Sequence, residues 1–200
     1  MHFDTMNSID TATRRLFSEA RSYNHWLSTP VPESLLRAVH DLAQMGPTSM
    51  NSQPMRLQFV VSEPARQRLL PCVKPANAGK IREAPAVAII GMDMRFHDRL
   101  PTLYPHNLEA HSLYEGKPEF LASTALRNSS LQGAYLIMAA RLLGLDCGPM
   151  SGFDAQAVDQ AFWSGTTVRT NFLCNLGYAD HAQIRPRGPR LAFDEICTVL

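Results

Sequence analysis

The segment from Gly46 to Pro54, GPTSMNSQP, carries four short polar side chains within six positions: Thr48, Ser49, Asn51 and Gln53. Hydroxyl and amide groups of this kind offer hydrogen-bond donors and acceptors that an organic ligand can use. A plain turn also explains the prolines and is the commoner structure for such a composition. On this segment alone, a turn and a ligand-binding loop both stay open.

Two other connections have the same polar character, ARSYNHW at residues 20–26 and the tail IRPRGPR at residues 184–190. Their candidate binding residues are Arg21, Ser22, Asn24, Arg185, Arg187 and Arg190. Taken alone, Arg21 is more typical of an ordinary helix end, because cations favour helix C-termini. The arginines become a binding prediction only together with other motifs.

A glycine-rich segment, GLDCGPMSGFD at residues 144–154, matches neither of two common active-site motifs. Its spacing is not G-x-G-x-x-G, and it follows a helix-like stretch instead of the first strand of a βαβ unit. Ser151 lies in G-x-x-S-G and not in G-x-S-x-G, the nucleophile elbow. We therefore assign no catalytic side chain.

Composition excludes several classes of partner. The 200 residues contain 19 Lys and Arg against 18 Asp and Glu, so no basic surface for nucleic acid or anionic lipid is expected. The four cysteines are widely spaced and form no metal-binding pattern. MHFDTMNSID resembles no signal peptide, and no apolar run is long enough to span a membrane. We expect a cytoplasmic protein with no metal, nucleic-acid or membrane partner.

The elements that must position these residues alternate between helices and strands, which predicts one α/β domain over residues 1–200. Helices are expected at 9–20, 33–45, 120–143 and 154–162, with another beginning at Pro64 and a short one after the final arginines. Strands are expected in MRLQFVVSE, APAVAIIGMD and VRTNFLCNLGYAD. Helix 120–143 carries an apolar stripe that predicts a core helix: Leu131, Ala134, Tyr135, Met138, Ala139 and Leu142. Residues 93–119 show no clear periodicity, and we expect a lid there.

In their order along the chain, these motifs resemble those of the nitroreductase family of flavin enzymes. ARSYNHW is similar to its N-terminal basic segment, GPTSMNSQP to its Pro-Ser-x-x-Asn-x-Gln-Pro segment, and LGLDCGPMSGFD to its glycine-rich segment. LPTLYPH, LRNSS and PRLAFDE resemble the subgroup that reduces malonic semialdehyde in pyrimidine utilisation. The resemblance implies an α+β fold with a mostly antiparallel sheet surrounded by helices, in a homodimer joined through helix 120–143.

The resemblance also implies two shared FMN sites at the dimer interface. Arg21, Ser22, Asn24 and Arg187, with Arg190 or Arg185, would meet the phosphate. Thr48, Ser49, Asn51 and Gln53 would meet the ribityl chain and the ring. The backbone N–H groups of Ser151 and Gly152 would face flavin N5 and O4, and Met150 would lie beside the ring. Ser151 stands where many family members have Glu, which bears on the redox tuning of the flavin. Asn24 stands where a cationic residue is common in the family, which bears on the source of charge for the phosphate.

The implied activity is ping-pong hydride transfer through flavin N5, from NADH or NADPH to malonic semialdehyde, which gives 3-hydroxypropionate. Two alternatives stay open. One is a broad reductase of nitroaromatics or quinones, and the other is a flavin-binding protein with no substrate of its own.

Overall fold

A computed structural model describes residues 11–200, and its centre is a four-stranded sheet of order β1-β2-β4-β3. The strands are β1 (Met55–Val60), β2 (Ala86–Asp93), β3 (Asp146–Met150) and β4 (Val168–Gly177). Every neighbouring pair is antiparallel, with register pairs such as Leu57 with Ile90 and Gly148 with Asn175. The expected antiparallel α+β architecture is confirmed.

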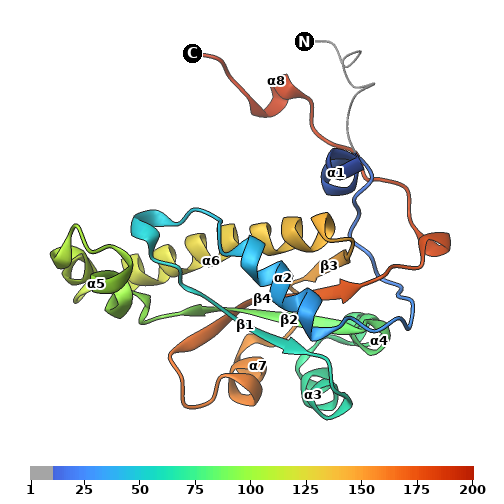
Figure 1. Cartoon of the computed structure of the whole chain (residues 1–200), viewed down its shortest axis with the longest axis horizontal. Helices are drawn as coiled ribbons and strands as arrows, with labels where there is room; N and C mark the ends of the chain where they lie inside the picture. The colour runs from blue at the N-terminus through green and yellow to red at the C-terminus, as the bar shows by residue number, and fades with distance from the viewer. Residues whose placement is uncertain (1–10) are drawn as a thin grey trace.

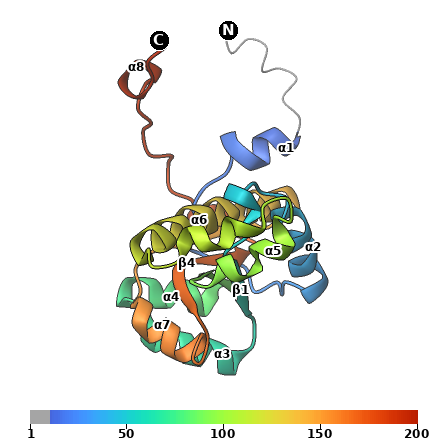
Figure 2. The ribbon, with the colours of Figure 1, turned by 90° about the vertical axis from the view of Figure 1, so that its left-hand side faces the viewer.

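Helices cover both faces of this sheet (Figure 1). The α-helices of the described residues are α1 (Thr11–Thr13), α2 (Glu33–Ala43), α3 (Glu63–Leu69), α4 (Pro75–Glu83), α5 (Leu100–Leu103), α6 (Pro118–Leu142), α7 (Ala155–Phe162) and α8 (Phe193–Ile196). Seen from the side, α2 and α6 lie against one face, and α3, α4 and α7 lie against the other (Figure 2).

Strand β2 explains why both faces are covered. Ala86, Ala88 and Ile90 belong to the core beneath α2 and α6, whereas Val87 and Ile89 belong to the core beside α3 and α7. Alternate residues of a strand face opposite sides, so a strand that is apolar throughout must be covered twice. The expectation that APAVAIIGMD forms a central strand is confirmed.

Two expected elements differ from the structure at the chain's first helix and in the glycine-rich segment. The expected helix 9–20 is short, because α1 gives way to a π-helical turn at Arg14–Ser18, and residues 9 and 10 lie outside the described part. The glycine-rich segment contains β3, which the sequence did not predict because Gly148 and Pro149 are poor strand formers. This strand brings the segment against β4.

The apolar stripe predicted as the core side of α6 is mostly exposed, although one of its residues, Ala139, is buried in the core. Leu131, Tyr135 and Leu142 are 44%, 42% and 43% exposed, while Leu136 and Ala140 face the sheet with no exposed surface. Gly133 allows this close approach, because a Cβ there would lie 2.6 Å from the ring of Phe172. Helix α6 therefore buries one side in this chain and presents a second apolar side to the surroundings.

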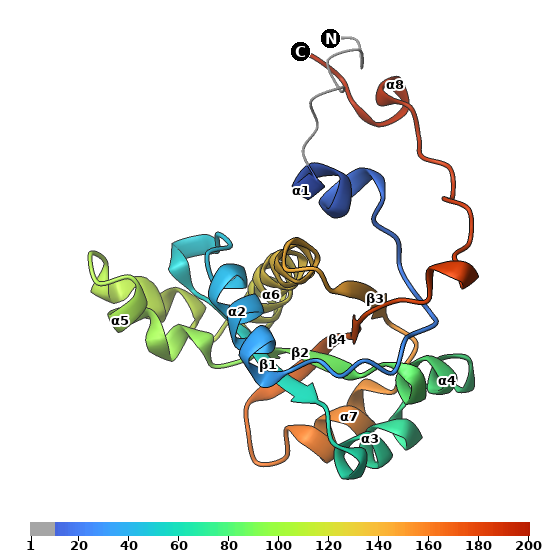
Figure 3. The same cartoon turned by 45° about the vertical axis from the view of Figure 1, so that its right-hand side comes forward.

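Residues 93–119, which we call the excursion, have their own small core. Phe96, Leu100, Ala110 and Tyr114 are buried there together with Ala125 of α6. The excursion projects beyond one end of the sheet, whereas α8 and the residues before it stand away from the layers (Figure 3). Within residues 11–200, none of the helices is both long and apolar enough to cross a membrane.

Candidate functional site

The two arginine-bearing segments, far apart in the sequence, line one cavity of about 400 Å³. One wall comes from residues 16–25 and the other from residues 180–190, with Arg141 of α6 between them. The predicted residues in its lining are Arg21, Ser22, Asn24, Arg185, Arg187 and Arg190. The structure thus brings together all the residues predicted for the phosphate.

Hydrogen bonds to backbone carbonyls hold these arginines in place. Arg187 Nη2 donates to the carbonyls of Ser18 and Ala20 at 2.8 and 2.7 Å. Arg21 Nη1 donates to the Ala20 carbonyl at 3.0 Å, and Arg141 Nη2 donates to the Arg21 carbonyl at 3.4 Å. The carbonyl oxygens therefore fix the guanidinium groups around the cavity without neutralising them.

The charges in this cavity leave room for an anion. Desolvation, followed by repulsion from Arg21, Arg190 and Arg141, holds the pKa of Arg187 below its usual value. Among the described residues, no carboxylate lies within ion-pair distance of Arg21, Arg141 or Arg187. Arg21 Nε is buried without a hydrogen-bond partner. An unpaired buried donor within a cationic cluster suits a phosphate, which accepts several charge-assisted hydrogen bonds.

Strand β3 connects this cavity with the glycine-rich segment. Ser22 forms a bridge with Cys147, and the amide of Tyr23 donates to the Cys147 carbonyl at 3.0 Å. A Cβ on Gly148 would lie 2.5 Å from the Tyr23 carbonyl oxygen, so this contact requires glycine. The predicted phosphate segment is therefore packed directly on the strand that leads to Met150.

Helix α4 lies beside the end of β3. The Gly152 carbonyl accepts hydrogen bonds from the Lys74 amide and the Asn77 side chain, both at 3.0 Å. Met150 is half-buried against the core, and Ser151 is exposed. Lys80, one helical turn after Asn77, lines a neighbouring cavity with Asn24 and Arg185.

Sequence reasoning missed Asn77, Lys80 and Arg141 as candidate site residues. The first two stand three positions apart in the sequence NAGK, which places them on one side of a helix. That spacing was the available signal, but it is common on solvated helices. Nothing in the sequence indicated that Arg141 would lie between the two basic segments.

The segment from Thr48 to Gln53 is a strained turn before β1. Met50, Asn51 and Gln53 have φ values of 52°, 49° and 41°, which non-glycine residues seldom adopt. Asn51 Nδ2 donates to the Leu103 carbonyl at 2.9 Å, and Gln53 Nε2 donates to Asn51 Oδ1 at 2.8 Å. Hydrogen bonds that hold the turn thus occupy some of its polar groups. Backbone strain of the kind seen at Met50, Asn51 and Gln53 often occurs at binding sites.

The strained turn and the arginine cavity lie along different halves of α6. The turn is fixed by Asn128, whose Oδ1 accepts from the Ser49 amide at 2.8 Å, whereas Arg141 lines the cavity. At 1.5 Å per residue, Asn128 and Arg141 are separated by about 20 Å along the helix axis. The predicted site residues therefore form three groups in one chain. The structure places in the arginine cavity neither the turn residues Thr48, Ser49, Asn51 and Gln53 nor the residues at the end of β3, Met150, Ser151 and Gly152.

Comparison with known proteins decides the family. The model of the nitroreductase family matches residues 18–178, which include the strained turn, β3 and most of the fold. The chain belongs to the nitroreductase family. This finding confirms the family predicted from the ordered motifs.

Relatives of this nitroreductase-family chain cover nearly its whole length. A Ralstonia pickettii protein named as an NADH dehydrogenase/NAD(P)H nitroreductase, HadB, is 55% identical over 92% of this chain and 95% of its own. One of the same description from Cupriavidus pinatubonensis is 52% identical over 92% and 94%.

Solved structures show the same fold. A Bacillus subtilis nitroreductase, YdfN, superimposes with a TM-score of 0.86 at 22% identity, with all of both chains covered. A nitroreductase from Exiguobacterium sibiricum, solved in complex with FMN, has a TM-score of 0.84 at 22% identity over 93% and 96% of the two chains.

Proposed function

We propose that this chain is an FMN-dependent NAD(P)H oxidoreductase that reduces malonic semialdehyde to 3-hydroxypropionate. The class and the cofactors are supported by membership of the nitroreductase family and by the NAD(P)H nitroreductase names of its relatives. The observation that carries the proposal is the arginine cavity, which unites two distant segments around a place for an anion. The aldehyde substrate is supported by the subgroup motifs in the sequence.

The arginine cavity would hold the FMN phosphate. Arg21 has a free buried donor there, and Arg187 and Arg190 approach from the C-terminal segment, with Arg185 as the alternative source of charge. Ser22 and Asn24 add neutral hydrogen-bonding groups to the same lining. Several fixed guanidinium groups around one anion give both affinity and orientation.

The remaining predicted residues would orient the rest of the cofactor. Thr48, Ser49, Asn51 and Gln53 would meet the ribityl chain and the ring with hydroxyl and amide groups. Met150, Ser151 and Gly152 would line the ring, the last two through the backbone. When bound, FMN would accept a hydride from a nicotinamide in one half reaction and give it to an oxidised substrate in the next.

A homodimer would reconcile the separation of the strained turn from the arginine cavity. The exposed apolar side of α6, which includes Leu131, Tyr135 and Leu142, offers an interface, because neighbouring exposed apolar side chains mark surfaces that other proteins cover. The turn of one subunit could then meet a flavin held by the arginines of the other. The C-terminal segment adds apolar groups that need a covering surface, because Leu191, Phe193 and Ile196 are 64%, 62% and 66% exposed.

Gel filtration with absorbance detection tests the shared site. Leu131→Asp places a charge in the proposed interface and should yield a monomer that has lost flavin, whereas Arg37→Asp on the exposed side of α2 should leave a flavin-containing dimer. A Leu131→Asp monomer that retains FMN would refute a site shared between subunits.

A broad reductase of nitroaromatics or quinones is the second candidate, and the names of the relatives favour it. Steady-state kinetics separates the two functions, because a dedicated enzyme should show a kcat/KM for malonic semialdehyde well above that for a nitroaromatic. The reverse order would favour the broad reductase. A flavin-binding protein without a substrate would bind FMN, but NADH and NADPH would not bleach it at a useful rate.

A further inference from the structure

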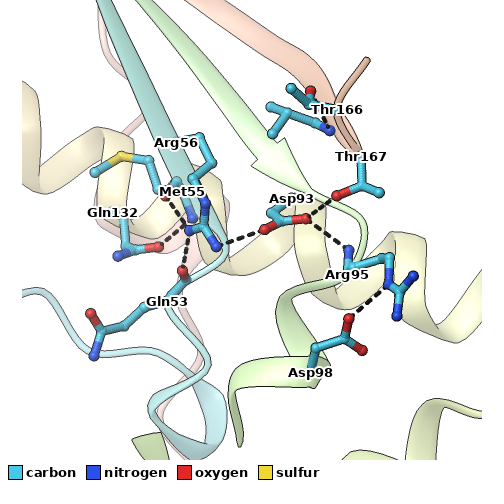
Figure 4. A network of polar contacts seen from close by, with 10 residues as sticks. Gln53, Met55, Arg56, Asp93, Arg95, Asp98, Gln132, Thr166 and Thr167 are labelled. Atoms are coloured by element: carbon cyan, nitrogen blue, oxygen red, sulfur yellow. Dashed lines mark hydrogen bonds and ion pairs between the residues drawn. The ribbon is translucent and has the colours of Figure 1, made fainter. Parts of the chain in front are cut away.

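The carboxylate of Asp93, at the end of β2, joins three segments that are distant in the sequence (Figure 4). Its Oδ2 accepts from Arg56 Nη2 at 2.7 Å. Its Oδ1 accepts from the Thr167 hydroxyl at 2.6 Å and from the Arg95 backbone amide at 2.9 Å. Both carboxylate oxygens are therefore satisfied, and Asp93 connects β1, the start of the excursion and the loop before β4.

Arg56 carries this connection to the strained turn. Its Nη1 donates to the carbonyls of Gln53 and Met55 at 3.0 and 2.8 Å (Figure 4). The amide of Asp93 itself donates to the Pro54 carbonyl at 2.8 Å. Gln53 has a φ of 41°, and a residue in that conformation stays there only where its surroundings restrain it. The guanidinium of Arg56 supplies such a restraint at the Gln53 carbonyl.

The position of the ion pair relative to the sheet argues for a role beyond joining two strands. In the ladder Arg56 is opposite Gly91, and the register of β1 with β2 ends at Met55 and Met92. The Arg56 side chain thus reaches along the sheet to Asp93, one residue beyond that last pair. The strained turn enters the sheet at this end, so the ion pair and the backbone hydrogen bond from Asp93 to Pro54 both restrain it.

We propose that Asp93, acting through Arg56, is a positioning residue that holds the strained turn in the conformation that presents Asn51 and Gln53 to the flavin. The inference rests on the proposed FMN site. Asp93 is itself buried, with 9% of its surface exposed, so it acts on the turn and not on the ligand. The same carboxylate fixes the Arg95 amide, and Asn51 bonds to Leu103, so the turn and the excursion are restrained together.

The test is a double-mutant cycle on the full chain, read out as the Kd for FMN. Asp93→Asn and Arg56→Met should each weaken FMN binding by about tenfold, the effect of losing one hydrogen bond to a charged group. The double variant should bind no more weakly than either single variant, because both substitutions remove the same restraint. Arg37→Met, which breaks the exposed pair with Glu33 on α2, is the matched control and should leave the Kd unchanged.

Two measurements distinguish a displaced turn in a folded protein from a general loss of folding. Circular dichroism should show native secondary structure, and the visible spectrum of saturated variants should show an altered flavin band shape. If Asp93→Asn does not fold, Thr167→Val, which removes one hydrogen bond to the carboxylate, should weaken FMN binding by about threefold. Additive effects in the cycle, or wild-type affinity in the folded single variants or in Thr167→Val, would overturn the proposal. A wild-type chain that does not bind FMN would instead overturn the proposed function.

Discussion

Replacement of Arg21 by Met should weaken the binding of FMN and leave the binding of riboflavin unchanged. Arg21 lies in the arginine cavity with a buried Nε that has no partner, so a phosphate there gains a charge-assisted hydrogen bond. Such a bond contributes about 1.5–3 kcal/mol, which corresponds to an increase of about 10- to 150-fold in Kd. Methionine keeps the length and apolar character of the side-chain stem while it removes the charge.

Flavin fluorescence, titrated against apoprotein with each ligand in turn, measures the two dissociation constants. Riboflavin lacks the phosphate, so its Kd reports contacts with the ribityl chain and the ring alone. Arg37→Met on the exposed side of α2 is the control for loss of a surface charge. Equal weakening of both ligands, or unchanged FMN binding, would refute the placement of the phosphate beside Arg21.

Asn51→Ala should weaken the binding of FMN and of riboflavin alike, by about tenfold, because its amide is expected to meet the ribityl chain and the ring, which both ligands contain. Weaker binding of FMN alone in the same titration would contradict this. Leu136→Ala should lower the free energy of unfolding by about 2–5 kcal/mol, because Leu136 is fully buried between α6 and the sheet, and urea denaturation measures this. The pKa of Asp93 lies below its usual value, since burial is outweighed by hydrogen bonds from Thr167, Arg95 and Arg56 and by the charge of Arg56. Its contribution to stability is therefore complete above the unfolded-state pKa of about 3.9 and is lost as the pH falls through the lower folded-state pKa. Asp93→Asn should lower the Tm at neutral pH and flatten its decline in acid, and a parallel decline in both proteins would contradict this.

Strands were predictable where burial leaves a pattern in the sequence. β2 is an almost continuous apolar run, and β1 and β4 are rich in apolar and β-branched residues, so their positions follow from that composition. β3 lacked this signal, because it is short and contains Gly148 and Pro149. It forms through pairing with β4, a long-range contact that no local pattern reports.

The apolar side of α6 shows a second limit. Leu131 and Tyr135 have helical spacing, but periodicity indicates only that a face is apolar and not which surface covers it. In this chain the sheet packs against the side with Leu136 and Gly133, and the polar side chains of Asn128 and Gln132 on α6 are buried as well. These two amides serve the backbone of the turn and of β1, a role that their position in the sequence does not reveal.

The candidate site was predictable in its parts but not in its assembly. The basic segments at residues 20–26 and 184–190 were both identified, and the structure shows that they share a cavity. Arg141 and α4 join them only through the tertiary fold. The separation of the strained turn from that cavity follows from the length of α6 and could not be derived from the motifs.

The most direct measurement is the visible absorbance spectrum of the purified protein under anaerobic conditions. We predict a flavin spectrum that bleaches on addition of NADH or NADPH and returns on addition of malonic semialdehyde. Return with a nitroaromatic alone would contradict the proposed substrate, and a protein that neither contains nor binds flavin would contradict the account as a whole.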